Sequence, residues 1–383
     1  MLICNAKIYD HATKSFFDGD ILVRDRKIVA VGSFERPSDE NEYIDACHRP
    51  VIPGLIDVHT HGRAGYDFVN TDADLSKMAA AYASHGVTTV IPTLASAPLP
   101  AMIDAAKKIN KFSPKDNEAD LFGIHLEGRW RNPAKIGAHA RDMLAPLNAG
   151  ELENEVFRMC RSLHVSAAFE LDTDGSFAKK ALELGATLGL GHTAANYEQA
   201  KTAELLGVTA YTHLFNAMPP LHHRDGGPVC AAFDGNAFAE LICDGIHVSP
   251  EMVRYAHRNL GSVRLGLISD SMEATGMPDG EYNIAGNPAF VKDGKALTPD
   301  GALAGSTLSL DSALKNLMSF ARLSLAEALP CATVNPAREI GIFDTVGSIT
   351  VGKRADILIL SDDKNADIEQ IILRGKLLHR GEK

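Results

Sequence analysis

Apolar and polar residues alternate in two different ways along this chain, and the difference predicts two kinds of structure. Near the N-terminus, residues 1–9 and 19–32 alternate apolar and polar positions with turn residues between them, as half-buried strands do. The same texture returns near the C-terminus over 347–352, 355–360 and 368–378. We therefore predict one small β-sandwich domain built from both termini, residues 1–51 and 347–383.

The middle of the chain, residues 52–346, repeats another unit. Short apolar runs suited to buried strands lie at 87–91, 121–126, 165–171, 187–191, 208–212, 240–243 and 264–269. Helix-like segments such as 75–85, 177–184, 197–206 and 309–321 separate them. Repeated β-then-α units imply parallel strands with right-handed crossovers, and about eight units of this kind predict a (β/α)8 barrel of the TIM type. A doubly wound open sheet is the alternative, but no G-x-G-x-x-G follows the first strand.

Composition narrows the class of protein. A hydrophobic content of 45% and a charged content of 23% are ordinary for a soluble enzyme, and no apolar run is long enough to span a membrane. The net charge of −11 disfavours nucleic acid as a partner. The first residues lack the basic and apolar regions of a signal peptide, and the six cysteines are scattered without a C-x-x-C pair. We expect a cytoplasmic protein with reduced thiols.

Side chains suited to metal binding follow the predicted barrel strands. In an extended strand, His59 and His61 project to the same side and can reach one ion. The carboxyl ends of barrel strands gather on one rim, where such residues would meet. A single residue of this kind is often structural or a helix cap, but six on one rim favour a metal site. The six are His59, His61, Glu127, His192, His213 and Asp270.

Several motifs in order along the chain resemble the N-acetylglucosamine-6-phosphate deacetylase family of the amidohydrolase superfamily. The most specific are His-Leu-Glu-Gly at 125–128 and His-Leu-Phe-Asn-Ala-Met at 213–218. Others lie at 53–62, 137–139, 191–193, 244–247, 269–270, 303–306 and 335–338, so the resemblance covers essentially the whole chain. It implies a metal-dependent hydrolase that removes acetyl from N-acetyl-D-glucosamine 6-phosphate, and it implies a homodimer.

The resemblance also implies a role for each position of the metal site. Glu127, His192 and His213 would hold the main divalent ion, while His59 and His61, with Glu127 bridging, would allow a second. Because both histidines of the pair are present, we predict a site able to bind two ions. Zinc is the expected metal, although imidazole and carboxylate ligands also suit iron, manganese and cobalt.

The remaining roles concern the substrate. By resemblance, Asp270 is the general base and acid, and His139 polarises the substrate carbonyl. The expected substrate-binding residues are His139, Asn216, Ala217, Arg224, His247 and Leu303, with the phosphate on Arg224, His247 and the backbone amides of Asn216 and Ala217. Arg224 lies on a Gly-rich loop, 218–228, and the sequence leaves open whether this loop acts within its own subunit or across the dimer interface. Its neighbours His222 and His223 are interpreted as ordinary loop residues.

Two departures from the family pattern stand near the expected substrate mouth. Arg129 replaces the usual Pro after His-Leu-Glu-Gly, with Arg131 two residues on, and 166–170 lacks the Pro that often precedes its Glu. We interpret the two arginines as solvent-facing charges, with contact to an acidic ligand as the alternative. Other functions left open are deacetylation of a galacto or unphosphorylated sugar, or hydrolysis of another amide. A catalytically silent metal-binding protein is disfavoured because a structural site needs neither Asp270 nor His139.

Overall fold

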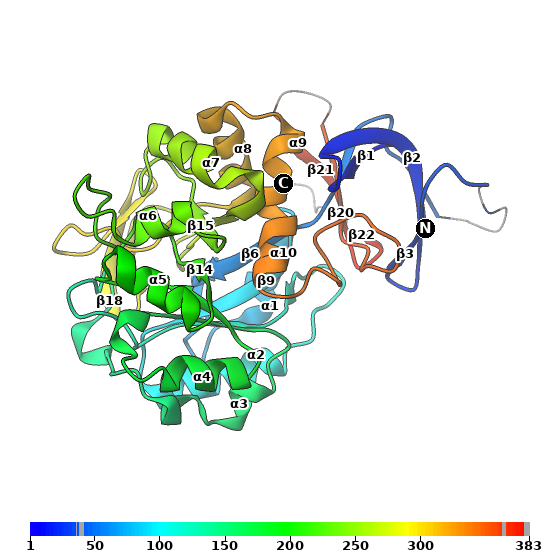
Figure 1. Cartoon of the computed structure of the whole chain (residues 1–383). Coiled ribbons are helices and arrows are strands. Elements are labelled where there is room, and N and C mark those ends of the chain that lie inside the picture. Colours follow the sequence, from blue (N-terminus) through cyan, green and yellow to red (C-terminus); the bar gives the residue numbers. More distant parts are fainter. Residues whose placement is uncertain (36, 38–41, 362–364, 379–383) are drawn as a thin grey trace.

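The computed structural model describes residues 1–35, 37, 42–361 and 365–378, and it has a barrel beside a second sheet (Figure 1). Eight strands run parallel in the order in which they occur in the chain. They are β6 (Leu55–Thr60), β9 (Val87–Ala95), β11 (Ile124–Glu127), β12 (Leu163–Ala167), β13 (Thr187–Leu190), β14 (Val208–Tyr211), β15 (Phe238–Ile242) and β16 (Leu265–Ile268). The short strand β10 (Asp120–Leu121) also pairs with β9. The predicted (β/α)8 barrel is confirmed.

Helices surround this barrel. They are α1 (Leu75–Ala83), α2 (Leu99–Asn110), α3 (Glu155–Arg158), α4 (Ser176–Glu183), α5 (Tyr197–Leu205), α6 (Gly227–Asp234), α7 (Pro250–Arg264), α8 (Leu310–Ala321), α9 (Leu325–Ala328) and α10 (Val334–Glu339). Longer ones such as α1, α2 and α8 bury an apolar face. The start of α5 is fixed by a capping box between Asn196 and Gln199, which satisfies two free backbone N–H groups. Among the described residues, no single helix is long and apolar enough to cross a membrane.

The barrel closes where the first strand, β6, meets the last, β16. The backbone N–H of Asp270 donates to the carbonyl of His59 at 2.9 Å. Two residues before His59 on β6, the carboxylate of Asp57 accepts hydrogen bonds from the backbone N–H of Ser269 at 3.2 Å and from its hydroxyl at 2.5 Å. This closure places Asp270 beside the histidine pair.

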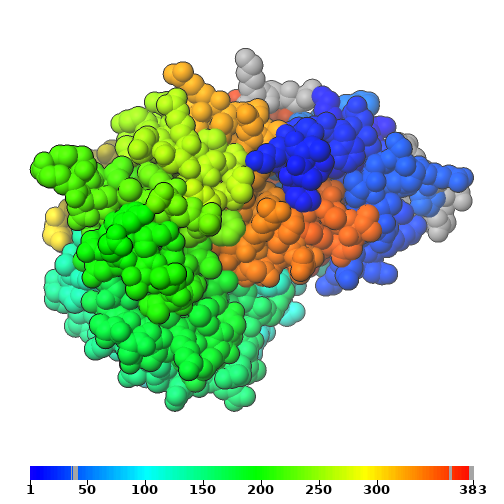
Figure 2. Space-filling model, viewed as in Figure 1, coloured from blue at the N-terminus to red at the C-terminus, as the bar shows by residue number. Residues whose placement is uncertain are grey.

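The second sheet combines both ends of the chain, as predicted. Its strands follow the order β22-β21-β20-β5-β1-β2-β3, with β4 paired to β1. Their bounds are β1 (Leu2–Asp10), β2 (Ser15–Arg24), β3 (Lys27–Gly32), β4 (Tyr43–Asp45), β5 (Pro50–Pro53), β20 (Ile357–Leu360), β21 (Ile368–Leu373) and β22 (Lys376–Leu378). The sheet has its own hydrophobic core, and its N-terminal part projects from one side of the molecule (Figure 2). Domain boundaries at 51 and 347 stay a prediction, and residues 36, 38–41, 362–364 and 379–383 of that domain lie outside the described residues.

Two predicted strands are wrong in part. Residues 347–352 form turns, because Gly347 and Gly352 adopt left-handed φ angles of 86° and 91° that an extended strand cannot contain. Ile349 between them is buried in the core of the second sheet without pairing to a strand. The run 165–171 leaves the sheet after Ala167 and forms a 3₁₀ turn over Phe169–Leu171.

Small sheets cover the carboxyl end of the barrel. A three-stranded sheet of β17 (Gly280–Ile284), β18 (Asn287–Lys292) and β19 (Lys295–Leu297) follows β16, and β7 (Gly62–Arg63) pairs with β8 (Tyr66–Asp67). The side-chain amide of Asn287 donates to the carbonyl of Ala138 at 2.7 Å. This bond ties the three-stranded sheet to the loop that carries His139.

Candidate metal centre and active site

Three buried side chains at the carboxyl ends of β11, β13 and β14 point at one another. Oε1 of Glu127 lies 3.1 Å from Nε2 of His192 and 3.1 Å from Nε2 of His213, and the two nitrogens are 3.0 Å apart. An ion bound about 2.0–2.2 Å from each atom fits such a triangle. The structure therefore brings Glu127, His192 and His213 together in a geometry that could hold one metal ion.

The hydrogen bonding of this cluster supports a cation. Nδ1 of His192 lies 2.8 Å from the carbonyl of Lys135, which can only accept, so that nitrogen carries the proton and Nε2 presents a lone pair. Burial lowers the pKa of His192 to about 3, so the ring is neutral. A lone pair aimed at a second imidazole nitrogen and a carboxylate oxygen is the donor set that a divalent metal requires.

A second group shares Glu127. Nε2 of His61 lies 3.2 Å from Oε2 of Glu127 and 3.2 Å from Oδ1 of Asp270, and Nε2 of His59 lies 3.6 Å from both oxygens. Glu127 thus turns one oxygen toward each group, and His59 Nε2 and Glu127 Oε2 are buried without a hydrogen-bond partner. The trio His59, His61 and Glu127 could hold a second ion.

The negative charge around His59 and His61 also favours a bound cation. Burial lowers the pKa of His61, but the carboxylates of Asp270 and Glu127 outweigh it and raise the pKa to about 9. Burial likewise opposes protonation of His59, yet Glu127, Glu240 and Asp270 raise its pKa well above the usual value. These carboxylates stabilise positive charge at the positions that a second ion would take.

Backbone strain marks the same strand ends. His192, His213 and Asp270 have φ angles of 46°, 33° and 48°, in the left-handed region that residues other than glycine rarely adopt. Each of them follows the last residue of its barrel strand or stands within two residues of it. Strain of this kind persists where the surrounding structure holds a side chain in place for function.

Glu240, which the motifs did not single out, fixes the orientation of His59. Its Oε2 accepts the Nδ1–H of His59 at 3.0 Å and the backbone N–H of His213 at 3.2 Å. A carboxylate behind an imidazole fixes its tautomer, leaving Nε2 of His59 free to bind an ion. In the sequence, Glu240 could have been noticed as one carboxylate within the otherwise apolar strand β15, which indicates a buried partner.

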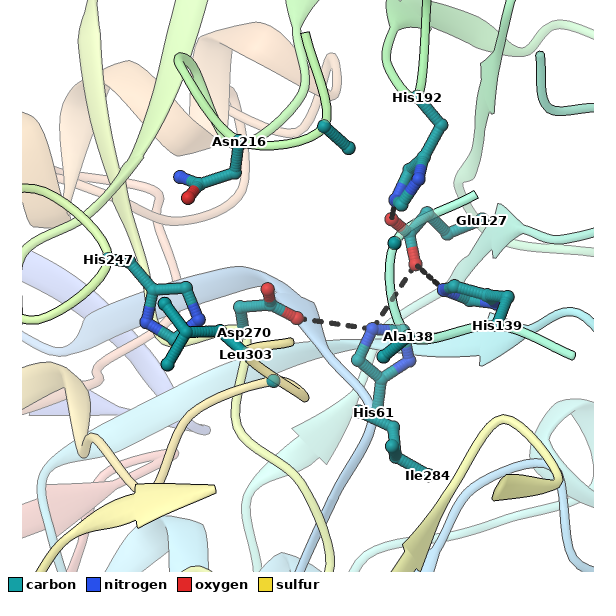
Figure 3. Close-up of a pocket in the computed structure, with 13 residues that line it drawn as sticks. His61, Glu127, Ala138, His139, His192, Asn216, His247, Asp270, Ile284 and Leu303 are labelled. Atoms are coloured by element: carbon teal, nitrogen blue, oxygen red, sulfur yellow. Dashed lines mark hydrogen bonds and ion pairs between the residues drawn. The ribbon is translucent and has the colours of Figure 1, made fainter. Parts of the chain in front are cut away.

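His139 enters the site from a loop and points toward Glu127 (Figure 3). The backbone N–H of Ser96 donates to Nδ1 of His139 at 3.3 Å, so the proton of the neutral ring is on Nε2. Burial and then the positive charge of Arg131 hold the pKa of His139 well below its usual value. His139 is therefore a neutral hydrogen-bond donor, 3.8 Å from Oε2 of Glu127.

Arg131 is buried, so our interpretation of it as a solvent-facing charge is wrong. Only 3% of the residue is exposed, and Nη2 of its guanidinium lies 3.0 Å from Oε2 of Glu127. Its Nε donates to Oγ of Ser96 at 3.1 Å, so Arg131 also supports the loop that contacts His139. The protein can bury Arg131 because the positive charge of its guanidinium compensates the negative charge of the buried Glu127 carboxylate. Arg129 is partly buried and pairs with Glu151 at 3.5 Å.

The cleft above these groups contains most of the predicted substrate residues. Its lining includes His61, Glu127, His139, His192, Asn216, Ala217, His247, Asp270, Ile284 and Leu303. His247 and Asn216 face Glu127 and His192 across this cleft (Figure 3). Nδ1 of His247 donates to Oδ2 of Asp244 at 2.7 Å, which leaves Nε2 as the polar atom for a ligand.

Arg224 does not join this cleft within one subunit. It is exposed on the loop between β14 and α6, and its Nη1 lies 2.7 Å from Nε2 of His223, which is exposed like His222. The cleft of a single chain thus offers His247 and the backbone amide of Ala217 to an anion, whereas the backbone N–H of Asn216 already donates to the carbonyl of His213 at 2.9 Å. No arginine is among the described lining residues.

Comparison with known proteins agrees with this site. A model of the amidohydrolase family matches residues 51–378. The chain is 36% identical to an N-acetylglucosamine-6-phosphate deacetylase of Vibrio furnissii (86% of this chain, 82% of the relative). It is 34% identical to an N-acetylgalactosamine-6-phosphate deacetylase of Escherichia coli O157:H7 (85% and 87%). A mutant N-acetyl-D-glucosamine-6-phosphate deacetylase from Mycobacterium smegmatis, solved with N-acetyl-D-glucosamine-6-phosphate, is 29% identical with a TM-score of 0.88 (98% of each chain).

Proposed function

Since this chain belongs to the amidohydrolase family, we propose that it removes the acetyl group from N-acetyl-D-glucosamine 6-phosphate, giving D-glucosamine 6-phosphate and acetate. One observation carries the proposal. A single cleft is lined by His139 and Glu127 on one side and by His247 and Asn216 on the other, with Asp270 between them (Figure 3). The first side suits an amide bond and the second suits an anion.

Asp270 has the properties of the general base. Burial raises the pKa of its carboxyl group, but the charges of His59 and His61 outweigh burial and lower it to about 2. Asp270 is therefore ionised at neutral pH and can accept the proton of the attacking water. Once protonated it is a strong acid, so it delivers that proton to the leaving nitrogen.

His139 and the metal cluster serve the carbonyl group. The Nε2–H of His139 donates to the carbonyl oxygen as negative charge develops on it, a contact typically worth about 10²–10³ in turnover. A divalent ion held by Glu127, His192 and His213 would lower the pKa of the attacking water and polarise the carbonyl of the amide. His59 and His61 would hold a second ion beside it.

The phosphate would lie at the opposite end of the cleft. Nε2 of His247 would face its oxygens, the backbone amide of Ala217 would donate to them, and Leu303 would contact the sugar ring. The backbone amide of Asn216 would join this group by sharing the hydrogen bond that it gives to the carbonyl of His213. We propose that the enzyme is a homodimer in which Arg224 of the partner subunit completes this group. The exposed position of Arg224 in one chain supports this arrangement, as does the bidentate match between guanidinium and phosphate.

Two further assignments belong to the proposal. Zinc is the proposed metal, because imidazole nitrogens with one carboxylate are typical ligands of catalytic zinc. The cytoplasm is the proposed location, because the six cysteines are scattered without a C-x-x-C pair, as expected of thiols in a reducing compartment.

The test is acetate release by the zinc-loaded protein from four sugars: N-acetylglucosamine and N-acetylgalactosamine, each with and without the 6-phosphate. We expect kcat/KM to be highest for N-acetylglucosamine 6-phosphate and lower by at least about 10³ without the phosphate. A preference for the galacto 6-phosphate would favour the second candidate function, which the similarity to the E. coli O157:H7 relative supports. Absence of hydrolysis with both phosphorylated sugars would refute the proposal.

A further inference from the structure

A second set of ligand-type side chains lies inside the barrel, on the side of His59 away from the cleft. It consists of His164 on β12, Glu240 on β15 and Glu339 at the end of α10. One ligand atom from each lies within 4.8 Å of the others, and the exposed fractions of the three residues are 0%, 0% and 2%. None of them lines the substrate cleft.

The polar atoms of this set lack partners. Nε2 of His164, Oε1 of Glu240 and both carboxylate oxygens of Glu339 are buried with no hydrogen bond. Buried polar atoms without partners are rare and costly, above all on carboxylates. Among the described residues, no lysine or arginine forms an ion pair with Glu240 or Glu339. Two carboxylates therefore meet in the barrel interior without a lysine or arginine partner among the described residues, and the one basic group paired with them at close range is His59, on Oε2 of Glu240.

The imidazole of His164 presents a lone pair at Nε2 in the tautomer whose Nδ1–H donates to the hydroxyl of Thr187. Its Nδ1 lies 2.8 Å from Oγ1 of Thr187, while its Nε2 lies 3.8 Å from Oε1 of Glu240. Burial lowers the pKa of His164 to about 4, which keeps the ring neutral. A neutral imidazole whose other nitrogen is occupied is the usual form of a histidine ligand.

Two glycines of the barrel strands lie close to the unpartnered atoms of His164 and Glu339. A Cβ on Gly189 of β13 would lie 2.9 Å from Nε2 of His164, and a Cβ on Gly266 of β16 would lie 3.1 Å from Oε2 of Glu339. Any larger residue at either position would crowd the same small region. The absence of a side chain at Gly189 and Gly266 thus lets both strands pass close to the unpartnered atoms without a clash.

We propose that His164, Glu240 and Glu339 bind a divalent transition-metal ion inside the barrel, separate from any ion in the cleft. One imidazole nitrogen and two carboxylate oxygens suit zinc, manganese or iron, and two negative charges balance the ion. Glu240 links the two sites, because its Oε2 accepts the Nδ1–H of His59 while its Oε1 faces the interior ion. The alternative occupant is a proton shared by the two carboxylates, since burial, the charge of Glu240 and, in the protonated form, a side-chain hydrogen bond with Glu240 raise the pKa of Glu339 well above its usual value.

Metal analysis separates these alternatives. We expect the Glu339→Gln variant, purified from zinc-supplemented medium and dialysed, to contain one metal equivalent less than the wild-type protein. Glu273→Gln is the matched control, because Glu273 is a similarly buried glutamate outside both clusters, and it should keep the wild-type metal content. Equal metal content in the wild type and Glu339→Gln would overturn the proposal.

Crystallography of the wild-type protein provides a readout that needs no variant to fold. An anomalous difference map at the zinc edge should show a peak about 2.0–2.2 Å from His164 Nε2 and from one oxygen of each glutamate. A peak confined to the cleft, with the two carboxylates in direct hydrogen-bond contact, would overturn the proposal in favour of the shared proton. The proposal is independent of the substrate, so failure of the deacetylase assay would leave it standing.

Discussion

The guanidinium of Arg131 lies 3.0 Å from Oε2 of Glu127, the carboxylate that both candidate metal positions share. This buried guanidinium stabilises the same carboxylate oxygen that a metal ion would bind. It keeps the pKa of Glu127 well below its usual value against the opposing effect of burial. The guanidinium and a second metal ion would therefore compete for the same oxygen.

We predict that Arg131→Met destabilises the metal-free protein, because the change leaves Glu127 buried without its partner. Loss of one member of a buried ion pair typically costs about 3–5 kcal/mol. Added zinc should recover more stability in the variant than in the wild type, because the ion then supplies the missing positive charge. Thermal unfolding with and without a chelator measures both effects.

Arg129→Met serves as the control for Arg131→Met. Arg129 pairs with Glu151 and contacts neither metal cluster, so its removal should lower stability less and leave the gain from zinc unchanged. Equal gains from zinc in the two variants would contradict the role given to Arg131.

Asp270→Asn should lower kcat by at least about 10³, because the variant has no base for water and no acid for the leaving nitrogen. KM should change little. Asp244→Asn provides the contrast, because Asp244 holds Nδ1 of His247 at the phosphate end of the cleft and its loss should act mainly through KM. Steady-state acetate release measures both constants. A kcat of Asp270→Asn within tenfold of the wild type would exclude Asp270 as the base.

The proposed role of Arg224 across the dimer interface predicts complementation. Arg224→Ala and Asp270→Asn should each be nearly inactive alone. After mixing, unfolding and refolding, half of the dimers contain one subunit of each kind. The Arg224→Ala subunit then has its own Asp270 and receives Arg224 of the partner subunit, so about a quarter of the wild-type activity should return. Activity no higher than that of the separate variants would place Arg224 within its own subunit or outside the site.

A buried ion pair away from the active site predicts how stability depends on pH. Asp120 accepts two hydrogen bonds from Arg161 at 2.8 and 3.0 Å and also pairs with Arg354. Burial raises the pKa of Asp120, but Arg161 and Arg354 outweigh it and the net shift is downward. The stabilisation is therefore present above the unfolded-state pKa of about 3.9 and is lost as the pH falls through the lower folded-state pKa.

We expect Asp120→Asn to lower the free energy of unfolding by about 2–3 kcal/mol at pH 7, because Arg354 retains Asp356 as a partner. The difference from the wild type should begin to shrink below about pH 4, where Asp120 takes up a proton in the unfolded chain, and should be lost as the pH falls through the lower folded-state pKa. Urea unfolding at pH 7 and pH 3 measures it. Asp116→Asn removes an exposed pair with Lys376 and should change stability little at either pH. A constant difference for Asp120→Asn across this pH range would contradict the assignment.

The barrel and most of its site were predictable because the signals are local. His59 and His61 project to one side of a strand whatever the rest of the chain does, and apolar runs that end in a ligand-type residue mark strand ends. The glycines of 347–352 were the exception, since two left-handed residues turned an apparent strand into turns.

The contacts of Arg131, Glu240 and Glu339 were not predictable in the same way. Glu240 meets His59 across 181 residues of chain, and Glu339 reaches the barrel interior from a helix near the end of the barrel segment. A charge in an apolar strand indicates that a partner exists, but it does not identify that partner. Only the folded arrangement places these groups behind or beside the predicted ligands.

The most direct test is to follow acetate release from N-acetylglucosamine 6-phosphate while zinc is added back to chelator-treated protein. If Glu127, His192 and His213 share an ion that hydrolysis requires, the metal-free protein will be inactive and the rate will rise with the first equivalent of zinc. His192→Gln should need far more zinc for the same fraction of its maximal rate. Full activity of the metal-free wild type, or identical zinc dependence of the two proteins, would contradict the account.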